Sequence, residues 1–132
     1  MPATSFDQQC DRLSQAVDAV QFERLRWART EAPMLDRLVE LAQAAVAERP
    51  DFELVDEGSA GAIKRFVLKV HGMRVVAITL GLDRGQVVVA AEEIERSKYR
   101  LANRPPTAAD FSKVDAPWMD AALQEAFGRI ET

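Results

Sequence analysis

Two glycine-marked turns separate three apolar runs within residues 62–91, and they constrain the fold of this chain more than any other feature. Gly72 comes after His71 and Gly85 comes after Arg84, each where a three-residue hairpin loop needs a residue with positive φ. The runs on either side are rich in β-branched residues, which is typical of strands. The stretch therefore predicts an antiparallel β-meander.

The length of each loop decides which side chains share a face of the predicted sheet. Three-residue loops place Lys69 opposite Met73 and Leu82 opposite Gln86. One face is then uniformly apolar and consists of Phe66, Leu68, Val76, Ile78, Leu80, Val88 and Ala90. The other face is mixed and contains Arg65, Val67, Lys69, Val75, Ala77, Thr79, Val87 and Val89. A two-residue loop at residues 71–72 would put Phe66 and Ile78 on opposite faces, so we favour the longer, bulged loops.

An amphipathic helix is predicted at the start of the chain, after a cap at Thr4 or Ser5. Its apolar residues recur at alternating spacings of four and three, and they are Phe6, Cys10, Leu13, Val17 and Val20. Such a narrow seam can pack on the sheet, on a second helix or across a dimer. We expect it to pack within its own domain, with Cys10 as a small core residue.

Two further helices are predicted. The first restarts after a break at residues 30–33, with Pro33 in its first turn, and ends near Glu48 before Pro50. The last is capped by Asp115 and carries a stripe of Trp118, Met119, Ala122, Leu123, Ala126, Phe127 and Ile130. We expect this stripe to lie on the sheet, with Trp118 and Phe127 as core anchors.

The remaining segments have weaker patterns. Residues 51–55 alternate as a first strand does, and the small residues 58–61 predict a loop. Residues 92–101 favour an irregular or edge-strand segment, and residues 107–110 favour a single capped turn.

These elements predict one α+β domain over residues 1–132. It comprises two N-terminal helices, an antiparallel meander of about four strands with a fifth edge strand as an option, and a C-terminal helix packed on the sheet. The hydrophobic content of 48% and charged content of 29% are ordinary for a globular protein. The chain has a single cysteine and no apolar run of membrane-spanning length. We therefore expect a cytoplasmic protein without a lipid anchor.

Basic residues gather in the middle of the chain. Residues 64–104 carry nine Lys or Arg against four Asp or Glu, while residues 1–63 carry six against twelve. Acidic helices that compensate a basic sheet are the usual cause of such a pattern. The alternative is binding of an anion or a single-stranded nucleic acid, through Arg65, Lys69, Arg74, Arg96, Lys98, Tyr99, Arg100 and Arg104. The net charge of −4 disfavours this alternative.

Residues for catalysis are sparse. His71, the only histidine, is predicted at an exposed hairpin tip, where nothing orients it as a general base. One histidine and one cysteine do not make a zinc set, and residues 58–64 lack the spacing of a phosphate-binding loop. We expect no cofactor and no metal, and an enzyme with a carboxylate-based site remains only a second alternative.

A non-catalytic protein-interaction module, which acts as a homodimer or binds another protein, is the leading hypothesis. Two surplus apolar features favour it: the seam of the first helix and the mixed sheet face. On that face we predict an interface made of Val67, Val75, Val87 and Val89.

Overall fold

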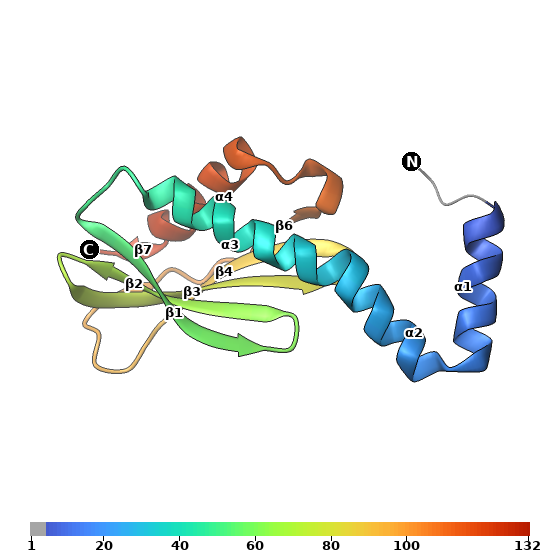
Figure 1. Cartoon of the computed structure of the whole chain (residues 1–132). Helices are drawn as coiled ribbons and strands as arrows, with labels where there is room; N and C mark the ends of the chain where they lie inside the picture. Colours follow the sequence, from blue (N-terminus) through green and yellow to red (C-terminus); the bar gives the residue numbers. More distant parts are fainter. Residues whose placement is uncertain (1–4) are drawn as a thin grey trace. The chain divides into compact units, whose positions relative to one another are not determined.

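The computed structural model describes residues 5–132 (Figure 1). In chain order the elements are α1 (Ser5–Val17), α2 (Ala19–Arg26), η1 (Trp27–Glu31), α3 (Ala32–Val46), β1 (Phe52–Ala60), β2 (Ile63–Val70), β3 (Met73–Asp83), β4 (Gln86–Glu92), β5 (Arg100–Leu101), β6 (Thr107–Asp110), η2 (Phe111–Lys113), α4 (Ala116–Gly128) and β7 (Ile130–Glu131). The chain divides into two units, Met1–Pro33 and Met34–Thr132. None of the described helices is long and apolar enough to cross a membrane.

An antiparallel sheet of five strands in the order β1-β2-β3-β4-β6 forms the second unit (Figure 1). Strands β1 to β4 are joined in sequence order, as the predicted meander requires. A separate two-stranded sheet pairs β5 with β7. The predicted α+β fold, with helices at both ends of the chain and a C-terminal helix, is confirmed.

Both long hairpins have two-residue loops, so the predicted three-residue loops are wrong. Val70 pairs with Met73 and Asp83 pairs with Gln86. The first loop residue of each is left-handed, with φ of 51° at both His71 and Arg84, and the glycines that follow also have positive φ. Two successive left-handed residues match the twist of the flanking strands better than a longer loop does.

The first hairpin nevertheless keeps its predicted faces, because a bulge interrupts the β2–β3 ladder. The register shifts after Leu68, so that Leu68 pairs with Val76 and Phe66 with Ile78. The β3–β4 ladder of the second hairpin has no bulge that would restore the predicted faces. Leu80 pairs with Val89, so Val87 and Val89 share the apolar face, and Val88 and Ala90 lie on the other.

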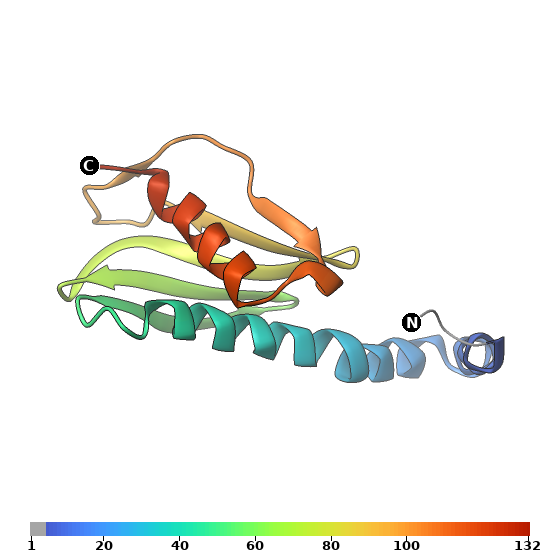
Figure 2. The ribbon, with the colours of Figure 1, turned by 90° about the horizontal axis from the view of Figure 1, so that it is seen from above.

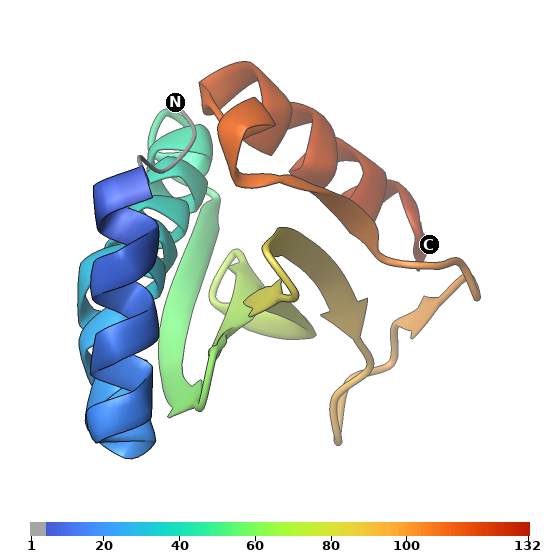
Figure 3. The ribbon, with the colours of Figure 1, turned by 90° about the vertical axis from the view of Figure 1, so that its right-hand side faces the viewer.

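Helices α3 and α4 cover that apolar face (Figures 2 and 3). The buried core consists of Leu54, Phe66, Leu68, Val76, Ile78, Leu80, Val87 and Val89 from the strands, Met34, Leu35, Leu38, Ala42 and Val46 from α3, and Met119, Ala122, Leu123 and Ala126 from α4. Asp115 caps α4 as predicted, and its Oδ1 accepts a hydrogen bond from the amide of Trp118 at 2.9 Å. Trp118 and Phe127 are intermediate in burial, and the ring of Phe127 stacks on that of Phe52 with the centroids 5.9 Å apart.

The opposite face of the sheet is covered in part by the segment that follows β4, which loops beneath the sheet in Figure 1. Ile94 forms a buried cluster with Val67 and Ala77. Ser97 fastens the segment, because its hydroxyl donates to the Val75 carbonyl at 2.6 Å. Apart from β5, residues 93–104 are irregular, in agreement with one of the two predicted forms.

The fifth strand lies elsewhere than the sequence predicts. Residues 107–110 form β6 and pair with β4, instead of making a capped turn. Pro105 and Pro106 directly precede this short edge strand, which is where proline is tolerated in a sheet. The predicted loop at residues 58–61 is mostly part of β1, with Gly58 at φ 101° in a register shift of the β1–β2 ladder.

The N-terminal unit also departs from prediction. The helix breaks at Asp18, whose extended backbone and side chain cap α2, with Oδ1 accepting from the Gln21 amide at 3.0 Å. The predicted break at residues 30–33 is instead the π-helical turn η1, which ends where α3 begins. In a regular α-helix the ring of Pro33 would crowd the carbonyl of Arg29 and leave it without a donor, and the wider π turn avoids this. The Thr4 cap lies outside the described residues.

Candidate functional site

The histidine and the cysteine that could do chemistry belong to different units of the chain. His71 is exposed at the β2–β3 hairpin tip, where its own amide donates to the Asp51 carbonyl at 2.9 Å. Cys10 is exposed on α1, so the prediction that it is a core residue is wrong. Within residues 5–132 no three His, Cys, Asp or Glu side chains come close enough to hold a metal ion.

Four of the seven predicted cationic contacts are engaged in ion pairs. Arg65 contacts Glu92 at 2.5 Å, Arg74 contacts Glu57 at 3.5 Å, Arg100 contacts Glu93 at 3.7 Å and Arg104 contacts Glu125 at 3.3 Å. These pairs are largely exposed, and each is worth little for stability. They neutralise the charge that a nucleic acid would need.

The other predicted contacts come from two segments of the second unit. Lys69 lies on β2, while Arg96 and Lys98 lie in the segment after β4. The Lys98 ammonium lies over the Tyr99 ring, 5.5 Å from its centroid. The Tyr99 ring also lines an apolar hollow with Phe52 and Phe127, so it is not an open stacking platform.

The predicted valine interface has lost its basis, because all four side chains are buried. Val87 and Val89 face α3 and α4, as the register of the second hairpin dictates. Val67 lies beneath Ile94, and Val75 is held at the bulge beside Ser97. The prediction failed because it assigned the second hairpin the wrong register and did not foresee the segment that covers Val67.

The seam of α1, in contrast, is exposed. Phe6 is 75% exposed, Leu13 54% and Val17 84%. In the whole of α1 no residue is buried. A helix that presents a continuous apolar seam to solvent is a candidate for contact with another helix.

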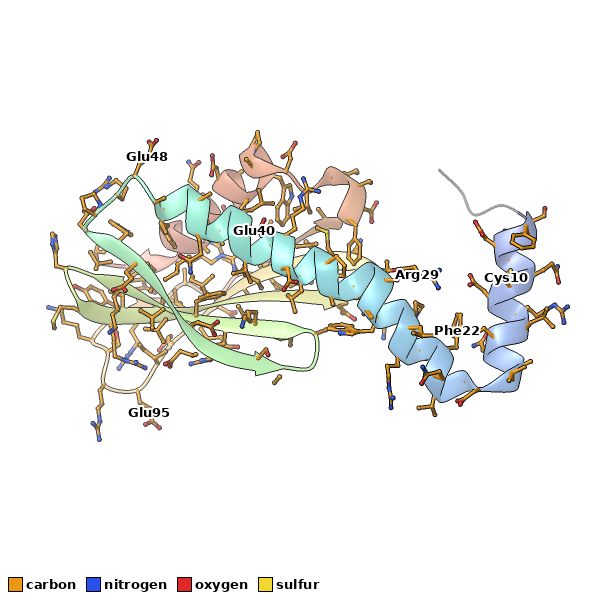
Figure 4. The ribbon with its side chains drawn as sticks, in the orientation of Figure 1. Cys10, Phe22, Arg29, Glu40, Glu48 and Glu95 are labelled. Atoms are coloured by element: carbon orange, nitrogen blue, oxygen red, sulfur yellow. The ribbon has the colours of Figure 1, made fainter. Side chains whose placement is uncertain are left out.

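A groove of about 310 Å³ lies between α1 and the helical stretch that follows it. Asp7, Cys10, Asp11 and Ser14 line it from α1, and Phe22, Leu25, Arg26, Arg29 and Thr30 line it from the other side. Figure 4 shows Cys10, Phe22 and Arg29 from these two sides. Arg26 is held by Glu23 at 2.8 Å and Glu31 at 2.6 Å, and the hydrogen bond that it donates to Glu23 raises its pKa.

Of the α1 seam, only Cys10 lines this groove, and Phe6, Leu13 and Val17 do not. At about 100° per residue, Phe6, Leu13 and Val17 centre on a line rotated by about 100° around the helix axis from Asp7, Asp11 and Ser14. Helix α2 therefore contacts the polar flank of α1. Within the first unit, the seam is therefore not packed against the helix that follows it.

Fold and surface together define a small α+β protein with a helix-covered antiparallel sheet and an N-terminal helical hairpin whose first helix exposes its apolar seam. Comparisons with family models, with curated proteins and with solved structures found no match for this chain. Its function has to be argued from its own residues.

Proposed function

We propose that the protein is a non-catalytic interaction module that forms a homodimer through α1. The observation that carries this proposal is the exposed seam of Phe6, Cys10, Leu13 and Val17. Spacings of four, three and four are those of the a and d positions of a heptad repeat. A seam of a and d positions alone is narrower than the apolar side of a helix that packs on a sheet, and it suits a second helix.

A second copy of α1 fits this seam by charge. In heptad terms the residues that flank the seam are Asp7, Gln9, Ser14 and Ala16, of which only Asp7 is charged. In an antiparallel pair, Asp7 of one copy lies beside Ser14 of the other, so no like charges meet. Small or neutral flanks let the two helices approach closely. The antiparallel order also opposes the two helix dipoles, which is favourable.

The antiparallel order also decides which seam residues of the two copies meet. Phe6 meets Val17 of the other copy, and Cys10 meets Leu13. Every seam position is thus filled by two apolar side chains, as a twofold interface requires. Two heptads make a short seam, so we expect a weak dimer that dissociates on dilution.

Light scattering coupled to size exclusion, at several protein loadings and two salt concentrations, tests the proposal. We expect the mass to rise from monomer to dimer with loading, and added salt not to weaken the dimer, because apolar contacts are not screened. Leu13→Glu should give a monomer at all loadings, since it puts a carboxylate of each copy into the seam. Gln15→Glu, the matched control, adds the same charge on the opposite side of α1 and should still dimerise. A wild-type monomer at every loading refutes the dimer.

A further inference from the structure

A shallow hollow of about 440 Å³ in the second unit lies where β4 ends. It is lined by Ala91, Glu92, Glu93, Leu101, Ala102, Asn103, Arg104 and Arg129. Arg129 follows the C-terminal end of α4, which runs beside the segment that carries β5 (Figure 2). The Arg129 carbonyl accepts from the Ala102 amide at 2.8 Å, and the pairing of Leu101 with Ile130 continues the contact. The backbone therefore holds Arg129 at this position.

The side chain of Arg129 is buried but poorly satisfied. The residue is only 5% exposed. Its Nη2 donates to the Pro105 carbonyl at 2.7 Å, which is its one side-chain hydrogen bond to any residue from 5 to 132. Its buried Nε has no acceptor, since the nearest carboxylate oxygen, from Glu125, is 3.7 Å away. A guanidinium has five N–H donors, and a buried charge with so few partners is costly.

The carboxylate of Glu125 is shared. The same Oε1 accepts a hydrogen bond from Arg104 Nη1 at 3.3 Å. Two guanidinium groups that line the hollow thus have one half-exposed carboxylate between them. The other carboxylates are taken: Glu92 pairs with Arg65, and Glu93 pairs with Arg100 and accepts from the Leu101 amide at 3.3 Å.

We propose that this hollow binds one carboxylate group of a small organic acid or of a chain terminus, held by Arg129 and Arg104. A carboxylate matches the planar fork of a guanidinium, and such bonds are charge-assisted. Two arginines and two glutamates line the hollow, and their ion-pair partners Arg65, Arg100 and Glu125 bring the count to four arginines against three glutamates, a single positive charge in excess. A monoanion balances it. A phosphate dianion would add a second negative charge beside Glu92 and Glu93, so we expect phosphate to bind less tightly.

The test follows the Nε–H resonance of Arg129 by NMR in the full ¹⁵N-labelled chain. Acetate is titrated at constant ionic strength against chloride, and then phosphate. We expect a saturable shift with acetate and a weaker response to phosphate. A blocked dipeptide with a free C-terminal carboxylate should also bind, whereas its C-terminal amide should not. Tighter binding of the dipeptide than of acetate would identify a chain terminus as the source of the carboxylate.

Substitutions separate binding from folding. Replacing buried Arg129 risks the fold, so the informative variant is Arg104→Gln, whose side chain is half-exposed. Losing one charge-assisted contact should weaken acetate binding about tenfold. Arg84→Gln removes the same charge from a remote hairpin tip and should bind as the wild type does. The proposal is overturned if the Arg129 signal does not saturate with acetate, if phosphate binds more tightly, or if both variants bind equally. None of these outcomes depends on whether the chain dimerises.

Discussion

Replacing Val17 by alanine should weaken the proposed dimer strongly and leave the monomer intact. The change deletes two methyl groups, each worth about 0.8 kcal/mol when fully buried. Val17 is 84% exposed in the single chain, so about 1.3 kcal/mol of this remains to be gained on dimerisation. Because the interface is twofold, the loss occurs in both copies. The free energy of dimerisation should therefore weaken by about 2.7 kcal/mol, which is about a hundredfold rise in Kd.

Sedimentation equilibrium over a wide range of loadings measures this Kd directly. The monomer should not suffer, because alanine is the better helix former and Val17 has no buried contacts to lose. Far-UV circular dichroism checks that helix content is kept. Val20→Ala is the matched control, because Val20 is 71% exposed and belongs to the predicted stripe, but the break at Asp18 places it on α2 and so outside the α1 seam. Equal Kd values for the two variants would contradict the assignment of the seam.

Three further predictions concern the fold. Gly72→Ala should destabilise the chain by about 1–2 kcal/mol in urea unfolding, because φ is 76° at this residue and alanine is strained there. Gly128→Ala, at a residue without positive φ, should cause no such loss. Equal losses of stability in the two variants would refute backbone strain as the cause. Asp115→Ala should cost about 1 kcal/mol through loss of the α4 cap, and Asp120→Ala, on the same helix, should cost clearly less. The hydrogen bond from Lys64 lowers the pKa of Asp56, so the stability that this carboxylate contributes is present at neutral pH and is lost as the pH falls through the lowered pKa. Lys64→Gln should raise the pKa of Asp56 in an NMR titration, and an unchanged value would show that Lys64 is not the cause.

Much of the architecture could be predicted because the patterns are local. The glycines after His71 and Arg84, the cap at Asp115 and the apolar stripe of α4 each depend on neighbours in the sequence. The loop length did not follow from them. A glycine after a tolerant residue fits both a two-residue and a three-residue hairpin, and the choice reverses the face of every later side chain. The bulge after Leu68 that restores one of the two hairpins has no local signal.

Contacts between distant segments set the limit of prediction. The pairing of β6 with β4 turned a predicted helical turn into a strand, which is tertiary context overriding local preference. The hollow beside Arg129 was also not predicted, because it is formed by the end of β4, residues 101–104 and the end of α4, which are far apart in the sequence. From the sequence alone, a single arginine at the C-terminal end of a helix is expected to be solvated and to interact favourably with the helix dipole. In the structure the side chain of Arg129 donates to the carbonyl of Pro105, a residue distant in the sequence.

Contacts between distant segments also decide which of the predicted apolar surfaces is exposed. The sequence predicted two such apolar surfaces, the four valines of the mixed sheet face and the seam of the first helix. The valines are satisfied within the second unit, two beneath the helices and two beneath or beside the segment from Ile94 to Ser97. Within the first unit, α2 does not cover the α1 seam, because the break at Asp18 turns α2 against the polar flank that carries Asp7 and Asp11. The residue that ends the first helix thus also keeps α2 off the apolar seam through which we propose that a second copy binds.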